Sequence, residues 1–226
     1  MANCLLALGA APLMLSDPRE FDELLSISSA VNLNLGSLDE TFIENTHNLL
    51  TLAYRKKIPI VLDPVGSGAS QLRTSLSRKL MDKVDIIKGN ASEIASLWQE
   101  GIKTKGVEST EILAIEPIAK ALANFLQKVV VVSGKVDYLT EGKTEYRIYE
   151  GSPFMKSVTG MGCTLGAVIA AFRAIVPDSL QASFLATQYF GVCGTVAAKK
   201  AKGPGSFRMH FLDALASHSG NILHAE

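Results

Sequence analysis

A glycine-containing turn, Thr159-Gly160-Met161-Gly162-Cys163-Thr164, stands directly before an apolar stretch with helical character. The two glycines, Gly160 and Gly162, would let a ligand approach the backbone closely, and the start of the following helix would present free N–H groups and a partial positive charge. Such a corner suits a phosphoryl group in transfer, whose negative charge is spread over its peripheral oxygens. The same pattern also fits a tight turn that begins a helix and binds nothing.

The cysteine of this turn is a second candidate for chemistry. Cys163 lies at the predicted helix start, where the helix dipole favours a thiolate. It could act as a weak base toward a substrate hydroxyl, although a free cysteine is more commonly a small buried hydrophobic residue. Cys4 and Cys193 occur in apolar helical contexts, so we interpret them as core residues.

Charged side chains follow two of the apolar runs. Asp63 ends one run, and Glu93 comes three residues after Asn90 at the end of the next. The two carboxylates could hold Mg²⁺ directly or through water, and Lys88 could neutralise nucleotide phosphates. The alternatives are an Asx turn before Pro64 for Asp63, a capping box for Asn90 and Glu93, and a solvated loop position for Lys88.

Apolar runs alternate with stretches of helical periodicity through most of the chain. The predicted strands lie at 31–36, 58–62, 84–87 and 129–132, with a hairpin over 136–140 and 146–149. The predicted helices cover 38–57, a segment ending at 81, a segment beginning at 90, 111–128 with a possible kink at Pro117, 163–175, 180–200 and 207–217. This alternation predicts an α/β fold of three layers in one domain, residues 1–226, with helices on both faces of a mostly parallel central sheet. Ligands of such sheets bind beyond the carboxyl ends of the strands, where the polar residues above should converge.

Composition limits the function classes. The chain has 22 Lys+Arg and 22 Asp+Glu, and this zero net charge argues against a nucleic-acid binder but not against a site for a small anion. Residues 1–15 are apolar, but no basic residue precedes Arg19, so a buried first helix is favoured over a signal peptide. No apolar run is long enough to span a membrane. The three cysteines and four histidines lack the spacing of a metal site. The dispersed, odd-numbered cysteines favour a reducing compartment, the cytoplasm.

Taken together, several stretches resemble the hydroxyethylthiazole kinase family, thiamine-salvage enzymes with the ribokinase-like fold. The matching stretches occur in the family's order and cover nearly the whole chain; they are Leu5 to Met14, Leu33 to Gly36, Val61 to Ala69, Lys88 to Ile94, Ser133 to Asp137, Thr159 to Cys163 and Gly203 to Phe207. No single motif is decisive, whereas the ordered set is specific.

The resemblance implies phosphorylation of the primary alcohol of 4-methyl-5-(2-hydroxyethyl)thiazole with ATP as co-substrate and Mg²⁺ as cofactor. It places Met14 in the thiazole pocket and Gly160 near the substrate hydroxyl, with Gly162 in the same turn. It also places Lys88 and Ser133 against ATP. Asn90 and Glu93 match an Asn-x-x-Glu element that organises Mg²⁺ and phosphate near Asp63. Cys163 stands where many ribokinase-like enzymes carry an aspartate base.

The resemblance further implies a homotrimer with sites at subunit boundaries. Lys88 and Ser133 stand where the family usually has Arg and Thr. Family members carry a few dozen residues before the equivalent of Ala2, including a first strand and a Thr-Asn element near the substrate, and the sequence begins after them. Two other functions stay open: a ribokinase-like kinase of a pyrimidine or pyridine alcohol, and a non-catalytic ligand-binding paralogue.

Overall fold

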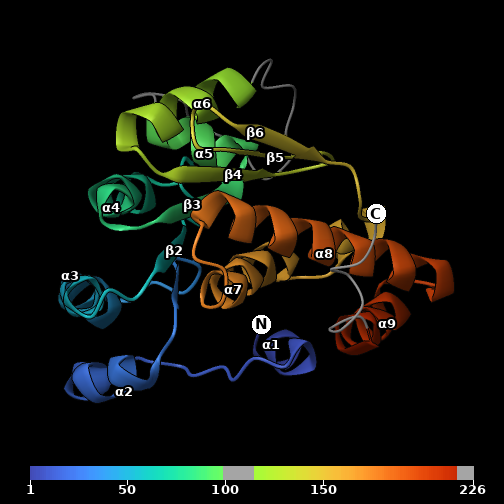
Figure 1. Cartoon of the computed structure of the whole chain (residues 1–226), viewed down its shortest axis with the longest axis horizontal. Helices are drawn as coiled ribbons and strands as arrows, with labels where there is room; N and C mark the ends of the chain where they lie inside the picture. The colour runs from blue at the N-terminus through green and yellow to red at the C-terminus, as the bar shows by residue number, and fades with distance from the viewer. Residues whose placement is uncertain (99–114, 218–226) are drawn as a thin grey trace.

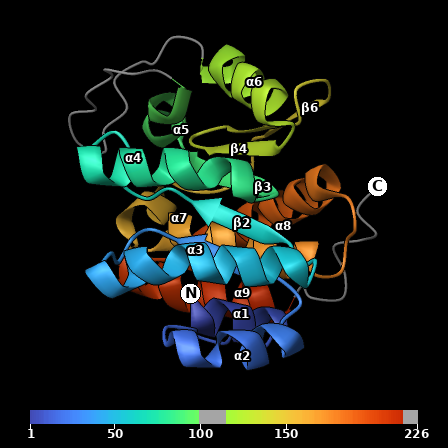
Figure 2. The same ribbon diagram turned by 90° about the vertical axis from the view of Figure 1, so that its left-hand side faces the viewer.

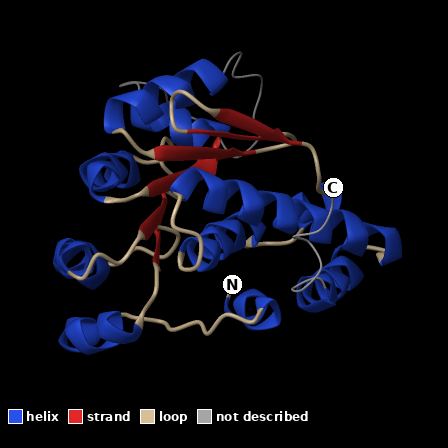
Figure 3. Cartoon of the chain, viewed as in Figure 1, coloured by secondary structure: helices blue, strands red, loops and turns tan. Residues whose placement is uncertain are grey.

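The computed structural model describes residues 1–98 and 115–217. Its strands form one six-stranded sheet and are β1 Val31–Asn34, β2 Ile60–Asp63, β3 Ile86–Asn90, β4 Val129–Ser133, β5 Asp137–Thr140 and β6 Glu145–Ile148. Its α-helices are α1 Ala2–Leu8, α2 Phe21–Ile27, α3 Glu40–Arg55, α4 Gln71–Leu80, α5 Ala91–Trp98, α6 Ile115–Leu126, α7 Met161–Arg173, α8 Ser179–Lys200 and α9 Pro204–Ser217. Figures 1 and 3 show these elements and their arrangement.

The strands lie in the sheet in their order along the chain. Strands β1 to β4 pair in parallel, and β5 and β6 add an antiparallel hairpin at one edge. The register pairs Asn34 with Asp63 and Asn90 with Ser133, so the carboxyl ends of the parallel strands lie together at one end of the sheet. The predicted α/β class and the mostly parallel sheet are confirmed.

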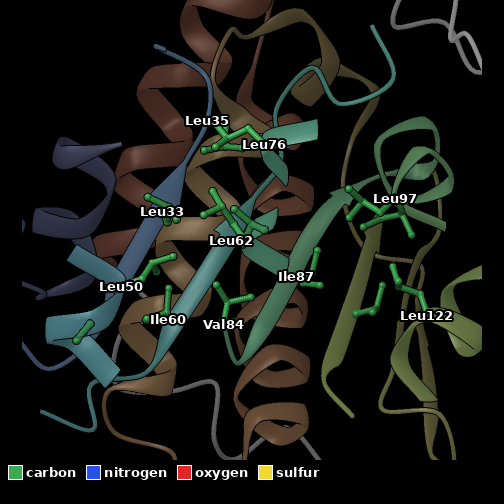
Figure 4. Close-up of a cluster of buried hydrophobic side chains, with 14 of the residues drawn as sticks. Leu33, Leu35, Leu50, Ile60, Leu62, Leu76, Val84, Ile87, Leu97 and Leu122 are labelled. Carbon is green, nitrogen blue, oxygen red and sulfur yellow. The ribbon is translucent and has the colours of Figure 1, made fainter. Parts of the chain in front are cut away.

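Helices cover both faces of the sheet. Because successive strand residues point to opposite faces, Ile60 and Leu62 pack against one helical layer and Val61 against the other. The first layer contains α2 to α6, and Figure 2 looks onto its helices α2, α3 and α4. Figure 4 shows the side chains buried between this layer and the sheet. The second layer contains α7, α8 and α9, with α1 packed against α7 and α9.

Three predicted boundaries need correction. Strand β3 continues through Lys88 and Gly89 to Asn90, which the sequence had placed after the strand. Helix α7 begins at Met161 rather than at residue 163. Helix α9 begins at Pro204 rather than at residue 207. Proline is well tolerated in the first turn of a helix, where its missing N–H has no intrahelical partner, so Pro204 can begin the helix.

Two further predictions, the burial of the first helix and the kink at Pro117, also need comment. The first helix, α1, is present as predicted, but none of its residues is buried, so the prediction that it is buried is wrong. Pro117 is the third residue of α6 as described, where no kink is required; the predicted residues 111–114 of that helix lie outside the described residues. Within residues 1–98 and 115–217, every helix is too short or too polar to span a bilayer.

Candidate active site

The glycine turn forms an open corner at the start of α7. Gly160 is the N-cap of the helix and has a φ of 85°, a left-handed conformation that glycine adopts without strain. The backbone N–H and the hydroxyl of Thr164 both donate to the Gly160 carbonyl at 2.8 Å. The N–H groups of Gly162 and Cys163 have no acceptor among the described residues. A Cβ placed on Gly160 would meet no atom within 4 Å, so the corner is accessible.

Lys88 lies directly beneath this corner. Its side chain is 3% exposed, and its ammonium donates to the Gly162 carbonyl at 2.8 Å and to Asp63 Oδ2 at 3.3 Å. The alternative of a solvated loop lysine is therefore wrong, because the residue belongs to buried β3. The ammonium joins the carboxyl end of the sheet to the first turn of α7 and adds positive charge beside the free N–H groups.

Asp63 is the buried carboxylate at the end of β2. Its side chain is 1% exposed, Oδ2 faces the Lys88 ammonium, and Oδ1 has no hydrogen-bond partner among the described residues. The alternative of an Asx turn is not what the structure contains, since the turn at Val65 uses the Asp63 backbone carbonyl instead. Burial raises the pKa of Asp63, and the Lys88 ammonium opposes this shift. A buried oxygen without a donor is a vacant acceptor for a cation or for cation-bound water.

Glu93 is held by backbone amides. Its Oε2 accepts from the N–H of Asn90 at 2.8 Å while Asn90 Oδ1 accepts from the N–H of Glu93 at 2.9 Å, so the predicted capping box is confirmed. Its Oε1 accepts from the N–H of Gly66, in the loop after β2, at 3.0 Å. Burial raises the pKa of Glu93, and these two amide hydrogen bonds oppose the shift. The carboxylate therefore ties together two neighbouring strand ends.

A third carboxylate near the carboxyl ends of the strands was not assigned a role from the sequence. Asp137 begins β5 and accepts from the N–H of Gly134 at 2.8 Å. Burial raises its pKa to about 6, opposed by that amide hydrogen bond and by the Lys88 charge. The neighbouring Ser133, at the end of β4, donates from its hydroxyl to the Gly89 carbonyl at 3.4 Å. The hairpin thus brings one more acidic group and one hydroxyl toward Lys88.

Sequence reasoning also missed Arg73, on α4. Its guanidinium donates to the carbonyls of Leu35, Val65 and Gly36, which lie in the loops after β1 and β2. The Gly66 N–H that holds Glu93 comes from the same loop as Val65. A single arginine on a helix gives no motif, and only the fold shows that its fork of donors crosslinks two loops of the site.

The structure brings together most of the predicted site residues, with one exception. Lys88 links Asp63 to the Gly162 turn, and the strand register places Asn90 beside Ser133. Cys163 is half-buried in the first turn of α7. Met14 is different: it lies between α1 and α2 with 85% of its surface exposed, so within one chain it does not line an enclosed pocket.

The donor set fits a magnesium ion that is bound mainly by water and phosphate. Among the described residues, no three His, Cys, Asp or Glu side chains converge on one point as a protein-only metal site would require. Mg²⁺ commonly uses one or two carboxylates and takes its remaining ligands from water and substrate phosphates. The unpartnered Oδ1 of Asp63 can supply one such contact, and Glu93, with both oxygens on amides, would act through water.

Solved structures of low sequence identity share this fold. A ribokinase-like superfamily protein from Enterococcus faecalis superposes with a TM-score of 0.67 at 16% identity and covers 96% of this chain and 80% of that chain. A Staphylococcus aureus pyridoxal kinase structure superposes with a TM-score of 0.64 at 17% identity and covers 86% and 82%. The chain therefore has the ribokinase-like fold, with its polar residues at the carboxyl ends of the strands.

The chain belongs to the hydroxyethylthiazole kinase family, whose model matches residues 1–220. A hydroxyethylthiazole kinase of Chlamydia caviae is 44% identical over 218 residues, which are 95% of this chain and 83% of the relative. Another, of Oleidesulfovibrio alaskensis, is 43% identical over 217 residues, 95% and 82% of the two chains. The structure of the hydroxyethylthiazole kinase protein of Pyrococcus horikoshii superposes with a TM-score of 0.90 at 33% identity, covering 100% of this chain and 85% of that chain. Family membership makes the chain a phosphotransferase.

Proposed function

We propose that one domain spanning residues 1–226 transfers the γ-phosphoryl group of ATP to the primary alcohol of 4-methyl-5-(2-hydroxyethyl)thiazole, in thiamine salvage. The observation that carries this proposal is the corner at the start of α7, where the free N–H groups of Gly162 and Cys163 lie next to the Lys88 ammonium. In the reaction a bond forms between the alcohol oxygen and the γ-phosphorus, the bond to the β–γ bridging oxygen breaks, and ADP leaves.

The chain's own groups would stabilise the charge of the transferring phosphoryl group. The two amides at the helix start point their hydrogens outward, and the partial positive end of α7 adds to them. Lys88 and the hydroxyl of Ser133 would contact the nucleotide from the ends of β3 and β4. Because the transition state of phosphoryl transfer is loose, positioning and charge stabilisation supply most of the lowering of the barrier.

Cys163 would accept the proton of the alcohol. A thiol is a weak base, but a loose transition state needs little help from proton removal before the oxygen attacks. The proton would pass from the alcohol to Cys163 in its thiolate form, giving the neutral thiol, and then to solvent. Gly160 would lie against the alcohol, since its lack of a side chain keeps that space open.

Mg²⁺ completes the proposed site, and when bound it would neutralise phosphate oxygens on the nucleotide. Asp63 Oδ1 would hold it directly or through one water, and Glu93 and Asn90 would position water and phosphate around it.

A matched test uses Glu93→Gln, which keeps the shape of the side chain but loses one hydrogen-bond acceptor for the amides of Asn90 and Gly66. We expect turnover to fall at least about tenfold and the Mg²⁺ requirement to rise, while circular dichroism stays unchanged. Unchanged turnover and Mg²⁺ requirement would refute this role.

Substrate identity can be tested with three alcohols. Purified protein is assayed for ADP release with the thiazole alcohol, a hydroxymethylpyrimidine and pyridoxal. Preferred turnover of the thiazole supports the proposal. Turnover of the pyrimidine or pyridine alcohol with an inert thiazole contradicts it, and thiazole binding without ADP release would indicate a non-catalytic paralogue.

We also propose that the active assembly is a homotrimer in the cytoplasm. The exposed apolar side chains of Leu6, Leu13 and Met14, at 60%, 46% and 85%, support a neighbouring subunit that covers this segment and completes the substrate pocket. The three free cysteines support a reducing compartment. Light scattering after size-exclusion chromatography measures the assembly; a monomer with full activity would contradict the trimer.

A further inference from the structure

A cavity of about 710 Å³ lies at the opposite end of the sheet from the candidate active site. Its walls come from the segments that precede the strands rather than those that follow them. They comprise the last turns of α3, residues 57–59 before β2 with Ile60 at its start, residues 82–85 before β3, Lys128 before β4, and Arg173 at the end of α7. In Figure 4, Ile60 and Val84 mark this end of the strands, and Leu35 marks the end that carries the active site.

The cavity concentrates positive charge in a chain whose net charge is zero. It is lined by five cationic side chains and two carboxylates, an excess of 5 − 2 = 3; the cations are Arg55, Lys57, Lys83, Lys128 and Arg173. None of these five cations pairs with a carboxylate among the residues that the structure describes.

The polar groups within the cavity leave this charge uncompensated. One of the two carboxylates, Asp85, accepts the backbone N–H of Ile60 at 2.8 Å. The Lys83 ammonium donates to Nδ1 of His47 at 3.1 Å, and the Arg173 guanidinium donates to the Ser179 hydroxyl and the Val176 carbonyl. Neutral acceptors satisfy hydrogen bonds of these cations but do not cancel their charge, so an anion would gain from entering.

The floor of the cavity is apolar. Leu50, Ile58, Ile60 and Val84 are buried beneath it, and the ring of Tyr54 stands at its side with 79% of its surface exposed. Inorganic phosphate would satisfy the cations but leave these surfaces in contact with water. A molecule with a flat apolar body and a phosphate would use both, and an exposed aromatic ring offers a face on which such a body can stack.

We propose that this cavity is a second ligand site, which binds a phosphomonoester with an aromatic or heterocyclic body. The site is separate from the phosphoryl-transfer corner. Helix α7 begins at that corner and ends at Arg173, and at 1.5 Å per residue its 13 residues place the two ends about 20 Å apart. The proposal does not depend on which alcohol the enzyme phosphorylates, because direct binding is what tests it.

The test measures binding of phenyl phosphate, AMP and inorganic phosphate to the full chain by calorimetry at low and high salt. The two phosphomonoesters separate a simple aryl body from a nucleoside. Hydrogen exchange then locates the bound probe. The cavity variant combines Arg55→Gln with Lys83→Gln, and the matched control combines Lys199→Gln with Lys200→Gln, which removes two exposed charges at the far end of α8. Circular dichroism confirms that both variants fold.

We expect phenyl phosphate to bind more tightly than inorganic phosphate, with exchange protection over residues 54–60 and 82–85. The cavity variant should bind phenyl phosphate at least about tenfold more weakly, and the control variant should bind it as tightly as the parent. High salt should weaken binding because exposed charges are screened. AMP protecting the same segments would identify nucleotides as a source of the ligand. The proposal is overturned by the absence of binding up to roughly 10 mM. Equal binding by the cavity variant, or protection confined to residues 160–164, would also overturn it.

Discussion

Replacing Lys88 by Met gives a sharp test of how the site is built. The Lys88 side chain is 3% exposed, and its ammonium lies 2.8 Å from the Gly162 carbonyl and 3.3 Å from Asp63 Oδ2. Methionine fills a similar volume but leaves the buried Asp63 carboxylate without its cation. Removing one partner of a buried pair costs about 3–5 kcal/mol of the free energy of unfolding. For a domain of this size, this is a loss of roughly 6–20 °C in Tm.

The loss should depend on pH with a definite sign. Burial already raises the pKa of Asp63, and the Lys88 charge opposes that shift, so the variant raises this pKa further. A carboxyl whose pKa is higher in the folded state destabilises the fold only where it is ionised in the unfolded chain. The penalty is therefore absent at acid pH, grows as pH rises above the unfolded pKa of about 4, and is complete above the folded pKa.

Urea denaturation of the parent and the Lys88→Met variant at acid and at slightly alkaline pH measures this difference. The double variant that also carries Asp63→Asn is the control, because its amide cannot ionise. We expect the single variant to be much less stable than its parent only at the higher pH, and the double variant to recover most of that loss. An equal loss at both pH values, or no recovery in the double variant, would show that Asp63 is not an uncompensated charge and would refute the reasoning.

Three further predictions concern the corner and its support. Gly160→Ala should lower turnover at least about tenfold, because a side chain at a φ of 85° costs about 1–2 kcal/mol and would shift the helix start, and an unchanged kcat in the folded variant would contradict this role. Cys163→Asp should keep or raise turnover, since its carboxylate is available as a base at neutral pH, and complete loss in a folded, ATP-binding variant would contradict this role. Arg73→Lys should raise the Mg²⁺ concentration for half-maximal rate about fivefold, because one ammonium cannot hold both loops, and an unchanged Mg²⁺ titration would argue against positioning by Arg73.

The alternation of apolar runs and helical periodicity was enough to predict the parallel sheet and its two helical layers. It also located the Asn90–Glu93 capping box, because a cap depends on residues three apart in the chain. The boundaries were less well predicted. Lys88 looked like a loop residue because a charged side chain is rarely buried in a strand, and its burial depends on partners from two other elements, Asp63 on β2 and the Gly162 carbonyl on α7.

Contacts between distant segments could not be predicted from the pattern. Arg73 gained its role when α4 packed beside the loops after β1 and β2, and Asp137 when the hairpin joined the sheet edge. The basic cavity could not be predicted from the sequence for the same reason. Its cations lie at widely separated positions, from Arg55 to Arg173, with no charge run in the sequence, and the start of three strands brings them together.

Three glycines in and beside the first turns of α7 explain how a helix start comes to lie against buried charge. Gly160 supplies the left-handed turn, and a Cβ on Gly162 would lie 3.3 Å from the Lys88 ammonium. A Cβ on Gly166 would lie 3.2 Å from Asn32 Oδ1 and 3.3 Å from Asp63 Oδ2, tighter than side chains normally pack. A side chain at Gly162 or Gly166 would therefore force α7 or these polar neighbours to shift. The Lys88 ammonium can therefore bridge Asp63 and the first turn of α7, because Gly162 and Gly166 bring no side chain into this space.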